Sequence, residues 1–283
     1  MLFPQISEYM QQNSDSRLID EICVSVVIPY SPEHTPSEML EEAKQSVKRQ
    51  SVPTEIIVVE DTEQRGPAWA RNRGLDRAKT RFVAFLDADD KWYPGKLRHQ
   101  LNAMNQYEAG LCVEGECESD SIKIDLDVFI RELLFGSFSS LTSSIVIDTS
   151  YASIRFREDL ARLEDHLFIT EMAVHSGVCL VDGPLTEINK HEEGLSARGT
   201  PEQMYNSRLK VAEYLSEYSP TKKYVNKIKQ LAYYGLGRQR QMRGNYLVSV
   251  PPLVQSLRYG IAIKPIGALA LTPWYIIKDT ISK

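Results

Sequence analysis

The first 90 residues alternate between short apolar runs and longer helical patterns, and this alternation restricts the possible folds more than any other feature. Runs rich in β-branched and aromatic residues at Cys23–Ile28, Glu55–Val59 and Arg81–Leu86 each predict a short buried strand. Helical patterns fill both intervals, one opened by the capping-box sequence Thr35–Glu38 and one by Gly66-Pro67. The strands start about 30 residues apart, the length of a right-handed βαβ unit. Near-continuous apolar strands are typical of a parallel sheet with helices on both faces.

The rest of the chain is less regular, but it separates into two parts. We expect residues 1–200 to form an α/β domain with an open, mostly parallel sheet, and residues 201–283 to form a helical C-terminal extension. Within the first part the patterns predict a loop or edge region at Ala109–Ser121, a helix at Leu126–Phe135, a strand at Ser143–Ile147, a helix at Leu160–His175 and a strand at Val178–Val181.

Composition places the chain among ordinary globular proteins. Its 283 residues are 42% hydrophobic and 25% charged, so it can bury a core without disulfides or a structural metal. The four cysteines include no Cys-x-x-Cys pair, and Cys23 and Cys179 are expected to be buried thiols in a reducing compartment. The N-terminus lacks the apolar core of a signal peptide, and no run reaches the roughly 18 apolar residues of a membrane span. We therefore expect a cytoplasmic protein.

The formal net charge of −5 conceals two oppositely charged parts. Residues 222–283 contain eleven Lys/Arg and one acid, a net +10, whereas the preceding 221 residues contain 22 Lys/Arg and 37 acids, a net −15. Aromatic residues are interleaved with the cations, and the run Ile266–Ile277 is apolar apart from Thr272. Such a tail suits a peripheral contact with the cytoplasmic membrane face, or equally a helical pack docked on the catalytic domain. Nucleic acid is not expected as a partner, because the larger part is acidic.

Acidic residues follow the second and third predicted strands. Glu60-Asp61 comes after one strand, and Asp87-Ala88-Asp89-Asp90 comes after the other. Ligands of open α/β sheets bind beyond the carboxyl ends of the strands, so these carboxylates are expected at one rim. They would repel one another unless a cation or hydrogen-bond donors met them, and carboxylate oxygens suit Mn²⁺ or Mg²⁺. Each acidic piece alone would also fit a solvated turn.

The fingerprints of other nucleotide-binding folds are absent from the sequence. There is no GxxxxGK[ST] loop, no GxGxxG after the first strand and no GxSxG elbow. The first strand ends in Pro29-Tyr30-Ser31-Pro32, which lacks the glycine-rich, basic loop usual in sugar nucleotidyltransferases.

Four segments in this order and spacing resemble the family 2 glycosyltransferases: V-S-V-V-I-P-Y at 24–30, I-I-V-V-E-D at 56–61, G-P-A-W-A-R-N-R-G at 66–74 and F-L-D-A-D-D at 85–90. The resemblance covers roughly residues 22–200. It implies a GT-A fold and a metal-dependent, inverting enzyme that uses a nucleotide-diphosphate sugar. It does not indicate which sugar is transferred.

The resemblance also implies roles for residues around the donor nucleotide. Pro29 and Tyr30 match the segment that lines the base pocket, and Asp61 matches the acid that hydrogen-bonds the base. Glu60 stands where the family usually has a first Asp, and Thr62-Glu63 replaces the usual Gly-Ser. Arg71 matches an arginine near the nucleotide, although a solvated helix cation is the alternative.

The family's Asp-x-Asp motif is matched by Asp87, Ala88 and Asp89. By resemblance the first acid meets the ribose or the metal, Ala88 lies against the donor, and the last acid holds the Mn²⁺ or Mg²⁺ that bridges the diphosphate. His191 matches a loop histidine that can approach the metal, and a plain loop histidine is the alternative.

Inverting transfer needs a general base to accept the proton of the acceptor hydroxyl. The family places this base in a Glu-Asp pair at the start of a later helix, which Glu164 and Asp165 match. We assign Asp165 as the base and Glu164 as a structural or acceptor-orienting neighbour, against the alternative of an exposed helix acid. A metal-stabilised diphosphate leaves without a general acid.

The expected function is therefore inverting transfer of a sugar from a nucleotide-diphosphate sugar to an acceptor hydroxyl. The expected acceptor is a surface glycan or a lipid-linked oligosaccharide. A sugar nucleotidyltransferase and a non-catalytic nucleotide-sugar-binding module are the two alternatives.

Overall fold

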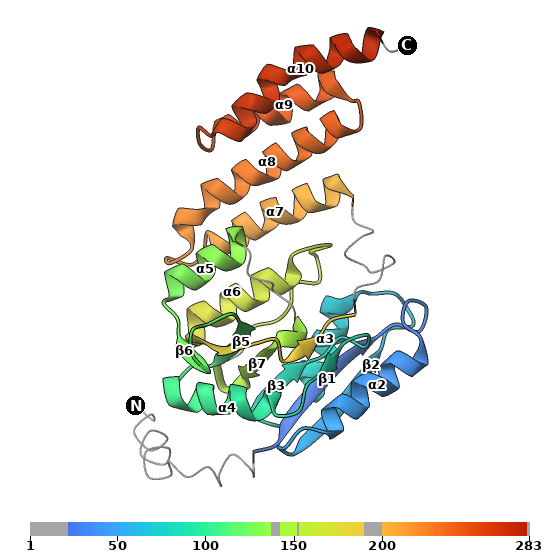
Figure 1. Cartoon of the computed structure of the whole chain (residues 1–283), viewed down its shortest axis with the longest axis vertical. Helices are drawn as coiled ribbons and strands as arrows, with labels where there is room; N and C mark the ends of the chain where they lie inside the picture. The colour runs from blue at the N-terminus through green and yellow to red at the C-terminus, as the bar shows by residue number, and fades with distance from the viewer. Residues whose placement is uncertain (1–21, 137–141, 152, 190–199, 282–283) are drawn as a thin grey trace. The chain divides into compact units, whose positions relative to one another are not determined.

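The computed structural model describes residues 22–136, 142–151, 153–189 and 200–281 (Figure 1). The chain divides into two compact units. The first comprises residues 1–156 and 168–190, and the second comprises residues 157–167 and 191–283. Residues 157–167 therefore pack with the C-terminal helices, although they precede the domain boundary expected at residue 200. His191 lies outside the described residues.

A seven-stranded sheet in the order β2-β1-β3-β7-β5-β8-β6 forms the centre of the first unit. β1 runs parallel to β2 and β3, and β5 runs parallel to β8, whereas β7 is antiparallel to both of its neighbours and β6 to β8. The prediction of an open, mostly parallel sheet is confirmed. The strands are β1 (Val24–Tyr30), β2 (Thr54–Glu60), β3 (Phe82–Phe85), β5 (Leu111–Gly115), β6 (Ser121–Lys123), β7 (Ile145–Asp148) and β8 (Val178–Asp182).

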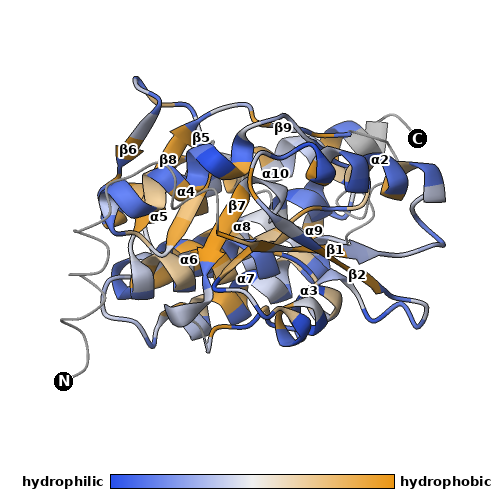
Figure 2. Ribbon diagram, turned by 90° about the horizontal axis from the view of Figure 1, so that it is seen from below, coloured by the Kyte–Doolittle hydropathy of each residue, from blue (hydrophilic) through white to orange (hydrophobic). Residues whose placement is uncertain are grey.

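Helices cover both faces of this sheet. α2 (Ser37–Lys48) and α4 (Lys96–Tyr107) share one apolar core with Val24, Val26 and Ile28 of β1. The intervening Val27 points to the other face, where α3 (Pro67–Arg77) approaches so closely that a Cβ on Gly74 would clash with Val27 Cγ1. Figure 2 shows the apolar strands β7 and β8 in orange, while much of α2 is blue. The unit also contains α5 (Leu126–Phe135), the short strand pair β4 (Lys91–Trp92) and β9 (Thr186–Glu187), and most of α6 (Glu164–Ser176).

The structure corrects three local predictions. The Ala109–Ser121 region is a loop or edge only in part, because Leu111–Gly115 form β5 between β7 and β8, whereas Ser121 begins the edge strand β6. α6 begins at Glu164 rather than near residue 160, since Leu163 has a φ of 67° and interrupts the helix. Thr35–Glu38 does not form a capping box, because α2 starts at Ser37 with Pro36 as an N-cap that offers no side-chain bond.

The second unit is helical, as the sequence predicts from Pro201 onward. Its helices are α7 (Pro201–Leu215), α8 (Val225–Met242), α9 (Tyr246–Leu257) and α10 (Ile263–Ile281), with a 3₁₀ turn at Lys222–Tyr224. α8 packs against α7 and α9, and α10 packs mainly on α9. The buried Gln241 side chain ties α8 to α10 by donating to the Ala268 carbonyl at 2.9 Å and to Thr272 Oγ1 at 2.7 Å. No helix among the described residues is long and apolar enough to cross a membrane.

Candidate active site

The carboxyl ends of β1, β2 and β3 lie side by side, as expected from the polar residues that follow each predicted strand. Tyr30 is in register with Glu60, and the Asp61 N–H donates to the Tyr30 carbonyl at 2.8 Å. The Leu86 N–H donates to the Val27 carbonyl at 3.0 Å, which fixes the start of the Asp-x-Asp loop beside β1. Pro29, Tyr30 and both acidic segments therefore occupy one edge of the sheet.

Asp61 holds the loop that leads from β2 into α3. The residue is buried, and its two carboxylate oxygens accept hydrogen bonds from the Arg65 N–H at 2.9 Å and the Gly66 N–H at 2.7 Å. Gly66 has a φ of 99°, a conformation that favours glycine. The neighbouring Glu60 is exposed, so the two acids of the pair have different environments.

Arg71 connects α3 to the Asp-x-Asp loop. Its side chain is only 6% exposed, and its Nη2 donates to Asp87 Oδ1 at 2.7 Å. The guanidinium also lies 5.5 Å from the centre of the Phe156 ring. The alternative of a solvated helix cation is therefore wrong, because Arg71 is a buried partner that orients Asp87. The Asp87 carboxylate stays 34% exposed and can still meet a ligand.

Ser143 holds the other end of the same loop. Its hydroxyl donates to Asp90 Oδ2 at 2.6 Å and accepts from the Asp87 N–H at 3.0 Å, and the Asn189 N–H donates to Asp90 Oδ1 at 3.2 Å. Burial and the nearby Asp87 and Asp89 charges nevertheless raise the pKa of Asp90 to about 7. The carboxyl groups of Asp87, Asp89 and Asp90 therefore create an excess of negative potential at this loop. Ala88, between Asp87 and Asp89, is buried.

A buried ion pair lies behind Ser143. Lys96 is fully buried and pairs with Glu114, which also accepts from the Leu185 N–H at 3.0 Å and from the Thr186 hydroxyl. Burial lowers the pKa of Lys96, although Glu114 acts in the opposite direction. Thr186 Oγ1 also lies 3.3 Å from the Ser143 carbonyl oxygen, so the same hydroxyl packs against the segment before β7. The sequence did not predict this network, because Glu114 falls in the segment expected to be a loop or edge region.

By itself, the acidic loop supplies only some of the ligands that a divalent cation needs. Among the described residues, no group of three or more His, Cys, Asp or Glu side chains is arranged to hold an ion. Asp89 is half-buried and Asp87 keeps an exposed edge. Mg²⁺ is commonly held by one or two carboxylates together with the phosphates of the substrate. Asp87 and Asp89 match that pattern, and a cation would relieve the negative potential that raises the pKa of Asp90.

Glu164 and Asp165 form the first turn of α6, within the second compact unit. Asp165 Oδ1 accepts from the His166 N–H at 2.7 Å and lies 2.8 Å from His166 Nδ1. The Asp165 side chain is 27% exposed, so it is neither buried nor an ordinary solvated acid. The strained backbone of Leu163 sets the direction in which this turn begins. His166 was given no role from the sequence, although its position next to Asp165 was visible there.

Comparison with known proteins identifies the domain. Residues 38–157 match the family model described as glycosyl transferase family 2. The chain contains a family 2 glycosyltransferase domain. The resemblance inferred from the four motifs is thereby confirmed, and the matched range includes Asp61, Arg71, Asp87 and Asp89.

Curated relatives of this glycosyltransferase domain take part in bacterial glycan synthesis. The amylovoran biosynthesis glycosyltransferase AmsB of Erwinia amylovora is 32% identical over 136 residues, which cover 39% of this chain and 42% of AmsB. The UDP-Glc:alpha-D-GlcNAc-diphosphoundecaprenol beta-1,3-glucosyltransferase WfgD of Escherichia coli is 32% identical over 111 residues, which cover 30% of this chain and 42% of WfgD. The chain thus spans less than half the length of these curated relatives.

A solved structure with the same fold covers more of this chain. S. aureus TarS 1–349, in complex with UDP-GlcNAc, superposes with a TM-score of 0.64 at 16% identity. The match covers 85% of this chain and 82% of that chain. The expected GT-A fold is confirmed by this likeness.

The buried Lys96–Glu114 pair yields a prediction about stability. Glu114→Gln leaves the Lys96 charge without its partner, and breaking a buried pair in this way typically costs about 3–5 kcal/mol. The free energy of unfolding, measured in urea, should fall by that amount. Lys96→Met/Glu114→Gln should recover most of the loss, because neither charge then remains buried. Glu41→Gln, which removes the exposed partner of Lys44, serves as the control and should change stability by less than about 1 kcal/mol. Equal losses in the buried and the exposed variants would contradict the role given to the pair.

Proposed function

We propose that this chain is an inverting glycosyltransferase that moves a sugar from a nucleotide-diphosphate sugar to an acceptor hydroxyl. The observation that carries the proposal is the Asp-x-Asp loop at the end of β3, held by Arg71, within a family 2 domain. A sugar nucleotidyltransferase would need a glycine-rich first loop, and β1 ends instead in Pro29-Tyr30. A purely binding module would need no general base, whereas Asp165 is available for that role in the first turn of α6.

The proposed reaction is a single displacement. The acceptor oxygen attacks the anomeric carbon while the bond from that carbon to the diphosphate oxygen breaks, so the configuration inverts. Asp165 accepts the proton of the acceptor hydroxyl, and His166 holds one carboxylate oxygen. Glu164 is the orienting neighbour.

The donor is proposed to bind at the ends of β1, β2 and β3. Pro29, Tyr30 and Glu60 border the base, and each Asp61 oxygen keeps a second lone pair for the base after accepting its loop hydrogen bond. Arg71, Asp87 and Ala88 face the ribose and diphosphate. Asp87 and Asp89 would hold Mn²⁺ or Mg²⁺, which neutralises the leaving diphosphate when bound. His191 is retained as a third ligand candidate.

The acceptor is proposed to be a surface glycan or a lipid-linked oligosaccharide. The names of two relatives support this class of acceptor. AmsB is named for amylovoran biosynthesis, and WfgD is named for a diphosphoundecaprenol-linked sugar. A nucleotide-sugar donor agrees with the UDP-GlcNAc complex of the structural neighbour.

A peripheral contact with the cytoplasmic membrane face is proposed for the helical unit. Ten of the thirteen exposed large hydrophobic residues of the described chain lie between Met242 and Ile277. Ile261 and Ile263 are 87% and 89% exposed, and the exposed cation Lys264 follows directly. Exposed apolar side chains beside cations suit an anionic lipid surface.

The metal proposal predicts the behaviour of Asp89→Asn. Loss of even an outer-shell partner typically lowers metal affinity about 10–100-fold, so loss of this carboxylate should cost at least as much. Calorimetry with UDP-sugars and Mn²⁺ measures the effect, with the exposed acid variant Asp120→Asn as control. Unchanged Mn²⁺-dependent nucleotide binding in Asp89→Asn would contradict the assignment.

The base proposal predicts that Asp165→Asn loses transfer and keeps donor binding. General-base catalysis typically contributes about 10²–10⁴-fold, and the amide cannot accept the proton. Turnover should fall by that factor in a radiolabelled transfer assay. Asp159→Asn, which removes a half-exposed acid of the same segment that pairs with Lys210, should transfer at a near-normal rate. Near-normal turnover of Asp165→Asn would exclude it as the base.

The membrane proposal predicts that Trp274→Ser/Ile277→Ser weakens sedimentation with anionic vesicles. Both side chains are more than half exposed, so the fold should survive, and each inserted apolar side chain contributes about 1.5–3 kcal/mol when fully buried. Partitioning should drop at least about tenfold. Tyr93→Ser/Val128→Ser removes exposed apolar residues of the first unit and should leave sedimentation unchanged. Wild-type protein that stays in the supernatant would favour the docked helical pack.

A further inference from the structure

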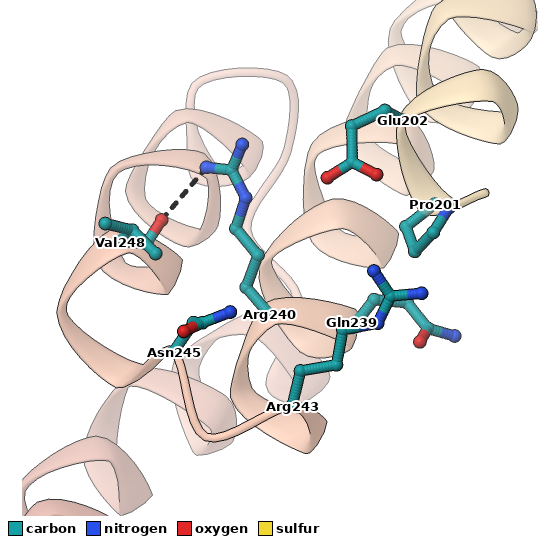
Figure 3. A pocket seen from close by; sticks show the side chains of 7 residues that line it. All are labelled: Pro201, Glu202, Gln239, Arg240, Arg243, Asn245 and Val248. Carbon is teal, nitrogen blue, oxygen red and sulfur yellow. Dashed lines mark hydrogen bonds between the residues drawn. The ribbon is translucent and has the colours of Figure 1, made fainter.

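A pocket of about 280 Å³ lies within the helical unit, apart from every residue assigned above. The tight turn between α8 and α9 forms one wall: Gly244 has a φ of 77°, and the Asn245 N–H donates to the Arg240 carbonyl at 2.9 Å. The first turn of α7 forms the opposite wall. The lining residues are Pro201, Glu202, Gln239, Arg240, Arg243, Asn245 and Val248 (Figure 3).

Two arginines supply the charge of this pocket. Arg240 Nη1 donates to the Val248 carbonyl at 3.0 Å, which orients the guanidinium and leaves its other N–H groups available. In the part of the chain that the structure describes, neither Arg240 nor Arg243 forms an ion pair. Figure 3 shows the Arg243 side chain extending toward Pro201 in the first turn of α7, whereas the Arg240 guanidinium lies beside Val248. The Glu202 carboxylate points from α7 into the space between them. The pocket therefore carries a net positive charge, which Glu202 reduces.

Backbone groups add to this positive character. Asn245 and Val248 belong to the N-terminus of α9, and Asn245 makes no capping hydrogen bond with its side chain. The first N–H groups of that twelve-residue helix therefore lack a side-chain acceptor, and they carry the positive end of the helix dipole. α7 differs, because Thr200 and Gln203 cap it with a complete capping box. Guanidinium groups and the N–H groups of a helix N-terminus both donate hydrogen bonds to phosphate oxygens, so their combination here suits a phosphate group.

Exposed apolar side chains include one lining residue, Val248, and two residues next to lining residues in the sequence. Val248 is 54% exposed, and the adjacent residues Leu247 and Met242 are 77% and 73% exposed. A free inorganic anion would gain nothing from these side chains, whereas a ligand that joins a phosphate to a hydrocarbon chain would cover them.

We propose that this pocket binds a phosphate or diphosphate group at the head of a lipid. The two guanidinium groups and the α9 N-terminus hold the phosphate oxygens, and Leu247, Val248 and Met242 contact the hydrocarbon. The proposal does not depend on glycosyl transfer. The pocket would bind the head group of either a lipid-linked acceptor or a membrane phospholipid.

The first experiment measures binding of soluble pyrophosphate to the full chain by thermal shift and calorimetry. EDTA is present and no donor is added, so the metal-dependent donor site stays silent and the result is independent of the proposed activity. Pyrophosphate should raise the melting temperature of the wild type by mass action. Arg240→Gln/Arg243→Gln should weaken binding at least about tenfold, because charge-assisted hydrogen bonds are lost. Glu202→Gln should tighten binding, because it removes the opposing charge.

Arg258→Gln/Lys264→Gln is the matched control, since it removes the same charge from exposed positions of the same unit. This control should keep wild-type affinity for pyrophosphate. An equal loss in the pocket and control variants would show diffuse attraction and overturn the site. The absence of any pyrophosphate response in the wild type would overturn it as well.

The second experiment identifies the source of the phosphate. Phosphatidylcholine vesicles carry phosphatidic acid, a polyprenyl diphosphate or phosphatidylserine, matched for total negative charge. We expect tighter sedimentation with the two terminal-phosphate lipids, and this preference should disappear in Arg240→Gln/Arg243→Gln. A preference for the polyprenyl lipid over phosphatidic acid assigns the pocket to the acceptor, and the reverse assigns it to phospholipid. Pyrophosphate binding without any vesicle preference would overturn the lipid part of the proposal.

Discussion

The accumulation of carboxylates after β3 is the constraint on which the first unit depends. Asp87, Asp89 and Asp90 lie within four residues, and such a group is unfavourable unless donors or cations meet it. Arg71 meets Asp87 from α3, and Ser143 meets Asp90 from the segment before β7. Both partners are buried, so the positions of α3 and β7 and the conformation of the loop are mutually dependent. Burial first, and the Asp87 and Asp89 charges second, raise the pKa of Asp90, and the proposed cation and diphosphate would bind at this loop.

A second buried charge supports the same region. Lys96 has no access to solvent, and its pairing with Glu114 joins the start of α4 to β5. Glu114 also binds the segment around Thr186, whose hydroxyl reaches the Ser143 carbonyl. Buried pairs of this kind are poor contributors to net stability but are costly to break. Their effect here is to fix Ser143, and through it the acidic loop, with little freedom to move.

The helical unit has a different physical character. Its helices bury apolar residues such as Leu236 and Leu253 together with polar contacts such as Gln241 with Thr272. It also leaves apolar side chains exposed on α9 and α10, and the cations Arg258 and Lys264 are exposed beside them. A soluble domain with no partner would gain nothing from exposing Ile261, Ile263 and Trp274. The combination of exposed cations and exposed apolar residues is the common basis of the membrane proposal and of the phosphate pocket.

The sequence alone determined the strand–helix alternation, the acids at the strand ends, the family resemblance and the basic tail. These features are local, because a strand's length and its last residues are set by apolar runs and by the residues that stop them. The sequence could not show that β7 runs antiparallel or that β5 is central, since strand order depends on how the layers pack. It could not pair Arg71 with Asp87, Ser143 with Asp90 or Lys96 with Glu114, because 16, 53 and 18 residues separate these partners along the chain. The pocket of Arg240 and Arg243 likewise exists only because the helical unit brings the α8–α9 turn to the first turn of α7. Local patterns fix where an element begins and ends, whereas buried charges find their partners only when distant elements pack together.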